Sequence, residues 1–342
     1  MRQDARRVLH GDVTMRAWGI DRGFHANSRR GLPSGMDFPS ELQYPTRWYS
    51  KFVVVIVAVA FFASLFTATI SAYVLYRILH PAVTHVELGT EFPGHPETFS
   101  FSVPGIGERS GWFFPGLRGA ATVVLCHGYG SSRGELLTLA SSLQDRQYNV
   151  YLFDFAGHGE SGGLTTLGLE EPREFEAAIN ALAKRDDVDP KRFGAWGTNI
   201  GAYVALAAAE RDPRVRAIAM ESVYDQPDDF LRAQVRQSGL ARIPFVERLT
   251  VKIFKWKNAD DRTVQPLSQR MGPLAGIPKL FLVAGDEPTL APLTRDLFHN
   301  APDPKQLSEL ATGNYAGMPD DAKRNYENRL LGFFLINLPA SQ

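Results

Sequence analysis

Cysteine is almost absent from this chain of 342 residues, which contains only Cys126. No internal disulfide can form, so a small disulfide-stabilised fold is excluded. Net charge is absent too, because 37 Lys and Arg residues balance 37 Asp and Glu residues, with no basic tract. Since nucleic acids bind proteins through clustered positive charge, nucleic acid is not an expected partner.

Metal and cofactor motifs are also missing from the sequence. The eight histidines show no H-x-x-x-H or similar spacing, so no metal site is expected. The glycine-rich segments lack the lysine of a phosphate-binding loop. The sequence therefore predicts no metal and no cofactor.

One long hydrophobic run stands out in an otherwise ordinary composition, which is 44% apolar and 22% charged. Residues 52–76 include no charged residue, and a helix of that length, at about 1.5 Å per residue, spans a bilayer core of about 30 Å. A buried core helix is the alternative, but core helices rarely extend so far without a charge. Ile70-Ser71-Ala72 matches a signal-peptide cleavage site poorly. An uncleaved, single-pass transmembrane helix is the prediction.

The segment before this run, residues 1–51, carries nine Lys and Arg against five Asp and Glu. It shows no periodicity, so we interpret it as a disordered basic tail, whose true start is Met1, Met15 or Met36. Only Arg77 follows the run closely, and the positive-inside rule therefore places the tail in the cytoplasm and the following domain outside it. Residues 77–95 are expected to be a linker.

From residue 96 to about 338, strand and helix signals alternate, which indicates a mostly parallel sheet with helices on both faces. An antiparallel pair is expected first, at 97–103 and 110–114. Continuous apolar runs then predict buried strands at 121–126 and 149–153, and two more strands are expected at 215–220 and 279–284. Helices are expected at 171–184, 293–299 and 322–336.

The nearly 60 residues between the strands that end at Met220 and begin at Lys279 are too many for a plain loop. Helical patterns occur within them at 228–237 and 243–257. We therefore expect a small helical cap, at about 224–276, over the carboxyl ends of the strands. Open α/β sheets bind their ligands at that edge.

The stretch from Phe193 to Ala209 carries the argument about function. An apolar run leads into Gly197-Thr198-Asn199-Ile200-Gly201, and an alanine-rich helix signal follows. This is the layout of a nucleophile elbow, a sharp strand-to-helix turn that holds one side chain at its apex. Covalent chemistry needs Ser, Cys or Asp at the apex, but the residue is Asn199, whose carboxamide is not a nucleophile.

Five segments together resemble the α/β-hydrolase superfamily, closest to its serine aminopeptidase-like and acylglycerol lipase-like members. The resemblance covers residues 96–338 and implies an α/β-hydrolase fold with a small helical cap, preceded here by one transmembrane helix. The segments, in order, are LCHGYGSSRGE (125–135), FDFAGHGESGG (153–163), GAWGTNIGAYVA (194–205), VQPLSQ to LFLVAGDEPTLAP (264–292) and LATGNYAG (310–317).

The resemblance implies a triad of Ser, His and an acid, and all three matched positions carry other residues. The flanking glycines align the Ser with Asn199. Counting from Gly285 aligns the acid with Pro288, and counting from Gly313 aligns the His with Ala316. The catalytic triad is therefore expected to be degenerate.

Other parts of the family site are present. The resemblance implies an oxyanion hole formed by the backbone N–H groups of Tyr129 and Ile200. It also implies loop-shaping roles for the motif residues His127, Gly128, Gly197 and Gly201.

Substitutes for the nucleophile can be named. Ser131 and Ser132 lie in the Gly130–Gly134 segment, and Ser161 lies in a second G-x-S-x-G match. Both matches fall within family motifs that shape loops, so neither is the expected nucleophile. Thr198 neighbours the apex, but strand alternation is expected to direct it away from the side of Asn199.

The sequence offers a substitute for the acid but none for the base. Glu287 or Asp286 can replace the acid if the alignment at Pro288 is shifted by one or two residues. No histidine replaces the base, because His127, His158 and His299 all lie in motifs or on a helix where structural or surface roles are expected. An acid without a base restores no activity.

We therefore expect a membrane-anchored pseudoenzyme that binds a small molecule, a lipid or a partner protein through the old pocket and cap. The alternative is an active ester or peptide hydrolase that uses a rearranged site. A third interpretation is a membrane-tethered scaffold in which the pocket has no role.

Overall fold

The computed structural model describes residues 48–82, 96–258, 264–313 and 315–341. The chain divides into two units, residues 1–55 and 56–342. Nearly all of the predicted basic tail lies outside the described residues, as do most of the predicted linker and a short part of the predicted cap.

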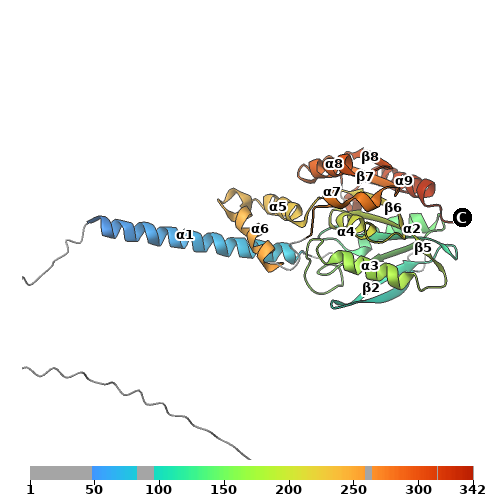
Figure 1. Ribbon diagram of the computed structural model, residues 1–342, viewed down its shortest axis with the longest axis horizontal. Helices are drawn as coiled ribbons and strands as arrows, with labels where there is room; N and C mark the ends of the chain where they lie inside the picture. Colours follow the sequence, from blue (N-terminus) through green and yellow to red (C-terminus); the bar gives the residue numbers. More distant parts are fainter. Residues whose placement is uncertain (1–47, 83–95, 259–263, 314, 342) are drawn as a thin grey trace, which may run out of the picture. The chain divides into compact units, whose positions relative to one another are not determined.

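An eight-stranded sheet forms the centre of the second unit (Figure 1). The strand order is β1-β2-β4-β3-β5-β6-β7-β8. β2 is antiparallel to both of its neighbours, and every other pair is parallel. The strands are β1 Glu97–Val103, β2 Gly107–Phe114, β3 Ala120–Cys126, β4 Asn149–Phe153, β5 Val188–Thr198, β6 Val215–Glu221, β7 Lys279–Ala284 and β8 Lys305–Leu310.

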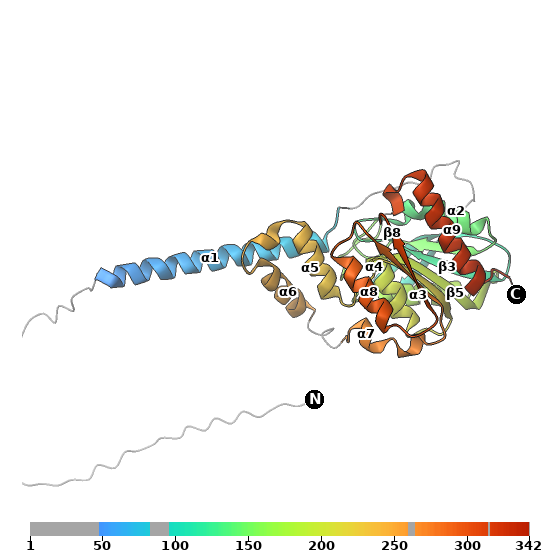
Figure 2. The same ribbon diagram turned by 90° about the horizontal axis from the view of Figure 1, so that it is seen from above.

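Helices cover both faces of this sheet, and each face has its own apolar core (Figure 2). Side chains of α3, α4 and α8 belong to the core of one face, and those of α2 and α9 belong to the core of the other. This mixed sheet between two helical layers is the α/β-hydrolase fold that the sequence predicts. The helices are α2 Leu137–Gln144, α3 Glu171–Leu182, α4 Ile200–Ala209, α8 Leu290–Asn300 and α9 Asp320–Asn337.

The prediction gave no bounds for α2 and did not include β8. β8 reads KQLSEL and is the edge strand after β7, with only Ser308 buried. An edge strand of this kind has no continuous apolar run, so the criterion that found β3 and β4 does not detect it. α2 has only eight residues, too few for a clear helical period.

The segment between β6 and β7 is helical, as predicted. It contains α5 Pro227–Gln237 and α6 Val246–Lys257, followed by the short α7 Leu267–Arg270. The ring of Phe230 in α5 lies 5.4 Å from that of Tyr129, which follows β3. α5 therefore contacts the loop that follows the carboxyl end of β3.

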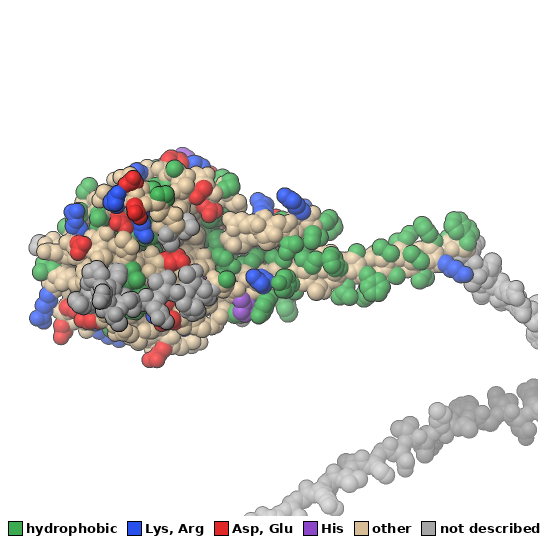
Figure 3. Space-filling model, turned by 180° about the vertical axis from the view of Figure 1, so that it is seen from behind, with side chains coloured by type: hydrophobic (Ala, Val, Ile, Leu, Met, Phe, Trp, Pro, Cys, Tyr) green, Lys and Arg blue, Asp and Glu red, His purple; other side chains and the backbone are tan. Residues whose placement is uncertain are grey.

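α1, Trp48–Leu79, extends beyond both ends of the predicted 52–76 span. By length and composition it is a candidate membrane span, and none of its most apolar stretch is buried. Figure 3 shows the hydrophobic side chains exposed along it.

The C-terminal turns of α1 pack against the cap and the hydrolase domain. Val74, Leu75, Ile78 and Leu79 are buried in the core on the α4 face of the sheet. The Thr250 hydroxyl of α6 donates to the Ser71 carbonyl oxygen over 3.4 Å.

Candidate active site

The elbow holds Asn199 at a sharp turn between β5 and α4. Its φ of 38° and ψ of −102° are strained for a residue with a side chain. A Cβ at Gly201 would lie 2.3 Å from the Cys126 carbonyl oxygen, and one at Gly197 would lie 2.3 Å from the Gly201 carbonyl carbon. Both positions therefore require glycine, since the backbone segments that cross there leave no room for a side chain.

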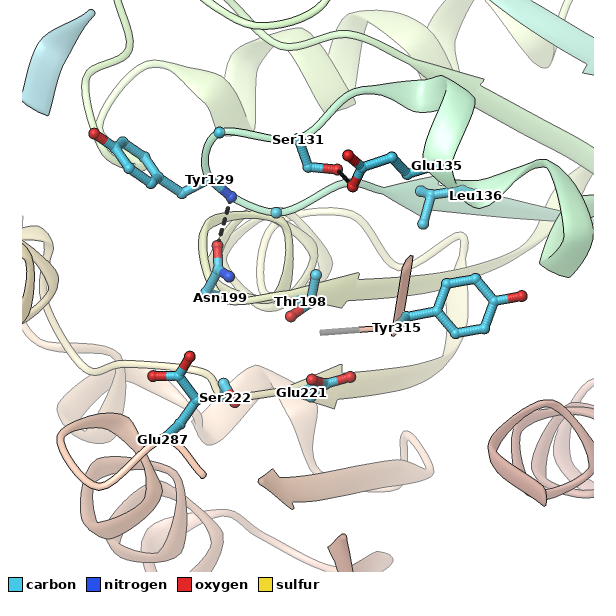
Figure 4. A pocket seen from close by; sticks show the side chains of 12 residues that line it. Tyr129, Ser131, Glu135, Leu136, Thr198, Asn199, Glu221, Ser222, Glu287 and Tyr315 are labelled. Atoms are coloured by element: carbon cyan, nitrogen blue, oxygen red, sulfur yellow. Dashed lines mark hydrogen bonds between the residues drawn. The ribbon is translucent and has the colours of Figure 1, made fainter. Parts of the chain in front are cut away.

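The Asn199 side chain folds back onto two backbone donors. Its Oδ1 accepts hydrogen bonds from the N–H of Tyr129 and from the N–H of Ile200, each at 2.7 Å. Both partners are donors, so the amide oxygen rather than its nitrogen must face them. Figure 4 shows the bond to Tyr129. The two N–H groups that the sequence assigns to an oxyanion hole thus meet on one atom of the chain itself.

A pocket of about 370 Å³ opens in front of this turn (Figure 4). It is lined by the loop after β3, the elbow, the end of β6, and the loops after β7 and β8. Asn199 and Tyr129 lie on one side of it, and Glu287 lies across from them.

Thr198 corrects one expectation, because it lines the same pocket as Asn199. Strand alternation predicts the opposite direction, but alternation ends with the strand. Asn199 stands in a turn at positive φ, so the rule does not apply between these two residues.

The acid region places two carboxylates near the pocket, and neither belongs to the residue aligned with the family acid. Pro288 is exposed and is not part of the described lining. Asp286 accepts a hydrogen bond from the Gly313 N–H over 2.6 Å, whereas Glu287 lines the pocket. Burial raises the pKa of the Glu287 carboxyl above its usual value, and the charge of Asp286 raises it further.

The described lining of the pocket includes no histidine. Ala316 lies in the short 3₁₀ helix 315–317, and its side chain lies outside the described residues. His299 is exposed on α8.

His127 and His158 are buried side by side, with ring centres 5.1 Å apart. His127 Nε2 accepts from the Phe155 N–H over 3.0 Å, so the proton is on Nδ1, which lies 2.8 Å from the Gly128 carbonyl oxygen. Burial lowers the pKa of each imidazole to about 4. Both rings are therefore neutral at pH 7, and His127 fixes loop geometry through both nitrogens.

The three serines weighed as substitute nucleophiles occupy different surroundings. Ser131 lines the pocket and donates to the Glu135 carboxylate over 2.5 Å. Ser132 is buried and is not part of the described lining. Ser161 donates to the Asp154 carbonyl oxygen and likewise lies outside that lining.

Glu221, Ser222, Glu135 and Tyr315 also line the pocket and were not singled out from the sequence. Glu221 ends β6, and Ser222 follows it directly. Polar residues at the carboxyl end of a parallel strand were a usable signal, because that edge carries the ligand site.

Comparison with known proteins agrees with the fold. A family model described as the alpha/beta hydrolase fold matches residues 121–240. An esterase from Pyrococcus furiosus superposes with a TM-score of 0.60 at 19% identity, covering 77% of this chain and 99% of the esterase. A hypothetical protein from Pseudomonas aeruginosa gives 0.56 at 16% identity, covering 75% of this chain and all of the other. At these identities the likeness shows the fold alone.

Two curated relatives are named as uncharacterized proteins. YfhR of Escherichia coli is 31% identical over 140 residues, which are 39% of this chain and 49% of YfhR. A protein of Mycobacterium tuberculosis is 28% identical over 186 residues, 51% of this chain and 65% of the relative. The chain thus spans about half the length of the first of these relatives.

Proposed function

We propose that this α/β-hydrolase-fold protein is a membrane-anchored pseudoenzyme that binds a small ligand in the pocket at the elbow. The observation that carries the proposal is the position of Asn199 Oδ1. It accepts from both Tyr129 N–H and Ile200 N–H, the donors that would stabilise an oxyanion in a working hydrolase.

Two chemical consequences support the loss of hydrolysis. An amide at the elbow offers no lone pair basic enough to attack a carbonyl carbon. A substrate carbonyl would also have to displace the Asn199 oxygen before it could reach the two N–H groups. The cavity itself remains open at about 370 Å³, which supports binding as the retained function.

The proposal is tested with the full chain purified in detergent. Short and medium p-nitrophenyl esters, assayed over a range of pH, should give no turnover above the rate without protein. Native mass spectrometry of the same preparation should detect a retained small molecule. Turnover that Ser131→Ala abolishes would replace the proposal with the second candidate below. A protein with neither turnover nor ligand would favour the scaffold.

The second candidate is an active ester or peptide hydrolase with a rearranged site, and the Ser131–Glu135 contact favours it. A hydroxyl that donates to a carboxylate over 2.5 Å, in a pocket, has the geometry of a nucleophile with its base. Ser131→Ala and Ser161→Ala are the matched pair. Only Ser131 lines the pocket, so only its loss should abolish such an activity.

The membrane anchor is part of the proposal, with α1 as the span and the hydrolase domain outside the cytoplasm. The unburied apolar stretch of α1 supports it, because water would be in contact with this surface in a soluble protein.

A further inference from the structure

We propose that the ligand of this pocket is a small organic cation, a primary amine in its ammonium form. This inference rests on the proposed ligand-binding function. Three glutamates line the pocket, Glu135, Glu221 and Glu287, and the described lining includes no Lys, Arg or His. Carboxylates that line a cavity repel anions and attract a cation.

An independent observation at Ser222 points to a ligand in the same place. Ser222 is only 3% exposed, lines the pocket, and holds a backbone φ of 51°. Its Oγ has no hydrogen-bond partner among the described residues. A buried hydroxyl without a partner costs free energy, and an ammonium N–H bound beside it would supply the missing hydrogen bond.

Glu287 has the carboxylate that a bound cation would pair with. Its carboxylate makes no hydrogen bond or ion pair with any described residue, although the residue is partly buried. The like charge of Asp286 also raises the pKa of the Glu287 carboxyl. A cation in the pocket would relieve both the burial and the repulsion, and an ammonium group has three N–H donors to offer.

The cavity favours a molecular cation over a single metal ion. No three Asp, Glu, His or Cys side chains in the described part of the chain converge closely enough to hold a metal. In Figure 4, Glu135 lies on one wall and Glu287 on the opposite one, with the pocket between them. A chain of several atoms with ammonium ends can reach both walls.

The test is isothermal titration of the full chain in detergent with three compounds of equal backbone length. 1,4-Diaminobutane is a dication, 1,4-butanediol is neutral and succinate is a dianion. The diamine should bind, and the other two should bind at least tenfold more weakly. Glu287→Gln should weaken diamine binding about tenfold, corresponding to about 1.4 kcal/mol. Glu287→Asp, which keeps the charge, should retain most of it.

The control variant is Glu309→Gln. Glu309 is an exposed glutamate paired with Arg295 and is not part of the described pocket lining, so its loss should leave diamine binding unchanged. Equal binding of butanediol, preferential binding of succinate, or no diamine binding would overturn the inference. So would diamine binding that Glu287→Gln leaves unchanged, or that is displaced by equimolar Mg²⁺ or Ca²⁺.

Failure of this inference is distinguishable from failure of the proposed function. Ester turnover by the unaltered protein contradicts the pseudoenzyme whatever the diamine does. Succinate or butanediol binding without turnover contradicts only the charge of the ligand and leaves a binding protein.

Discussion

At the scale of single residues, Asn199 keeps the backbone turn of a nucleophile elbow and places an amide at its apex. Its backbone keeps the strained conformation of the elbow, and its side-chain oxygen satisfies the two amides beside it. The Ser side chain has two fewer heavy atoms and no planar amide, so a serine at this apex would leave the Tyr129 and Ile200 N–H groups free for a substrate.

Asn199→Ser alone should give no measurable esterase activity, because no base stands at Ala316 to take the hydroxyl proton. Members of a triad act as a unit, so one restored member achieves little. Asn199→Ser, Pro288→Asp and Ala316→His together should hydrolyse a short p-nitrophenyl ester. The double variant without Ala316→His is the matched control. Equal rates for the double and the triple variant would show that this alignment of the base is wrong.

Neutral, buried His127 should make the protein sensitive to acid. Its folded pKa of about 4 lies below the ordinary value of 6.5, so between these values the unfolded chain takes up a proton that the folded chain refuses. Its stabilisation is complete above pH 6.5 and falls as the pH drops toward 4, by up to about 3 kcal/mol. His158 acts in the same direction.

Glu174 opposes this effect, because burial raises its carboxyl pKa to about 7, and its contribution falls as the pH rises from 4.5. The measurement is therefore a difference: melting temperatures at pH 7 and pH 5 for the unaltered chain and for His127→Gln. The unaltered chain should lose more stability between the two pH values than the variant does. An identical loss in both would contradict the assignment to His127.

At the scale of elements, the crossing of β3, β5 and α4 fixes the elbow. Gly201→Val should destabilise the fold by roughly 1–3 kcal/mol, because its side chain meets the carbonyl oxygens of Cys126 and His127. Gly332→Ala on α9 is the control, since nothing lies within 4 Å of a Cβ there. Thermal melting compares them, and an unchanged melting temperature for Gly201→Val would mean that the crossing is looser than described.

Sequence patterns located the elements with the plainest signals. β4 and β7 have the expected bounds, since each is a continuous apolar run buried on both faces. The edge strand β8 is polar and only its pairing with β7 defines it. A single amino-acid sequence does not show which strands pair.

Only the site residues that lie in sequence motifs could be predicted. The loop after β3 and the elbow indicated Asn199, Tyr129 and Ile200, but no motif indicates that the Asn199 oxygen bonds to both N–H groups. That contact depends on one side-chain rotamer. Ser222 lines the pocket and has a positive φ. The neighbouring residues in the sequence do not indicate this backbone conformation.

At the scale of the whole molecule, the proposed orientation of α1 predicts on which side of the membrane the pocket lies. A reporter joined after Gln342 should be active only outside the cytoplasm, and detergent should be needed to extract the chain. Alkaline phosphatase and a cytoplasmic fluorescent protein, fused at the same position, form the matched pair. A bright fluorescent fusion with a silent phosphatase would reverse the orientation, and recovery in the soluble fraction would exclude the anchor.

Tyr129 touches α1 and the elbow at once. Its hydroxyl donates to the Ile78 carbonyl oxygen over 2.8 Å, while its backbone N–H donates to Asn199. If α1 crosses a bilayer, its tilt follows the thickness of the surrounding lipid. Tyr129 then connects that tilt to the wall of the pocket, so a change in bilayer thickness would change the position of a residue that lines the pocket.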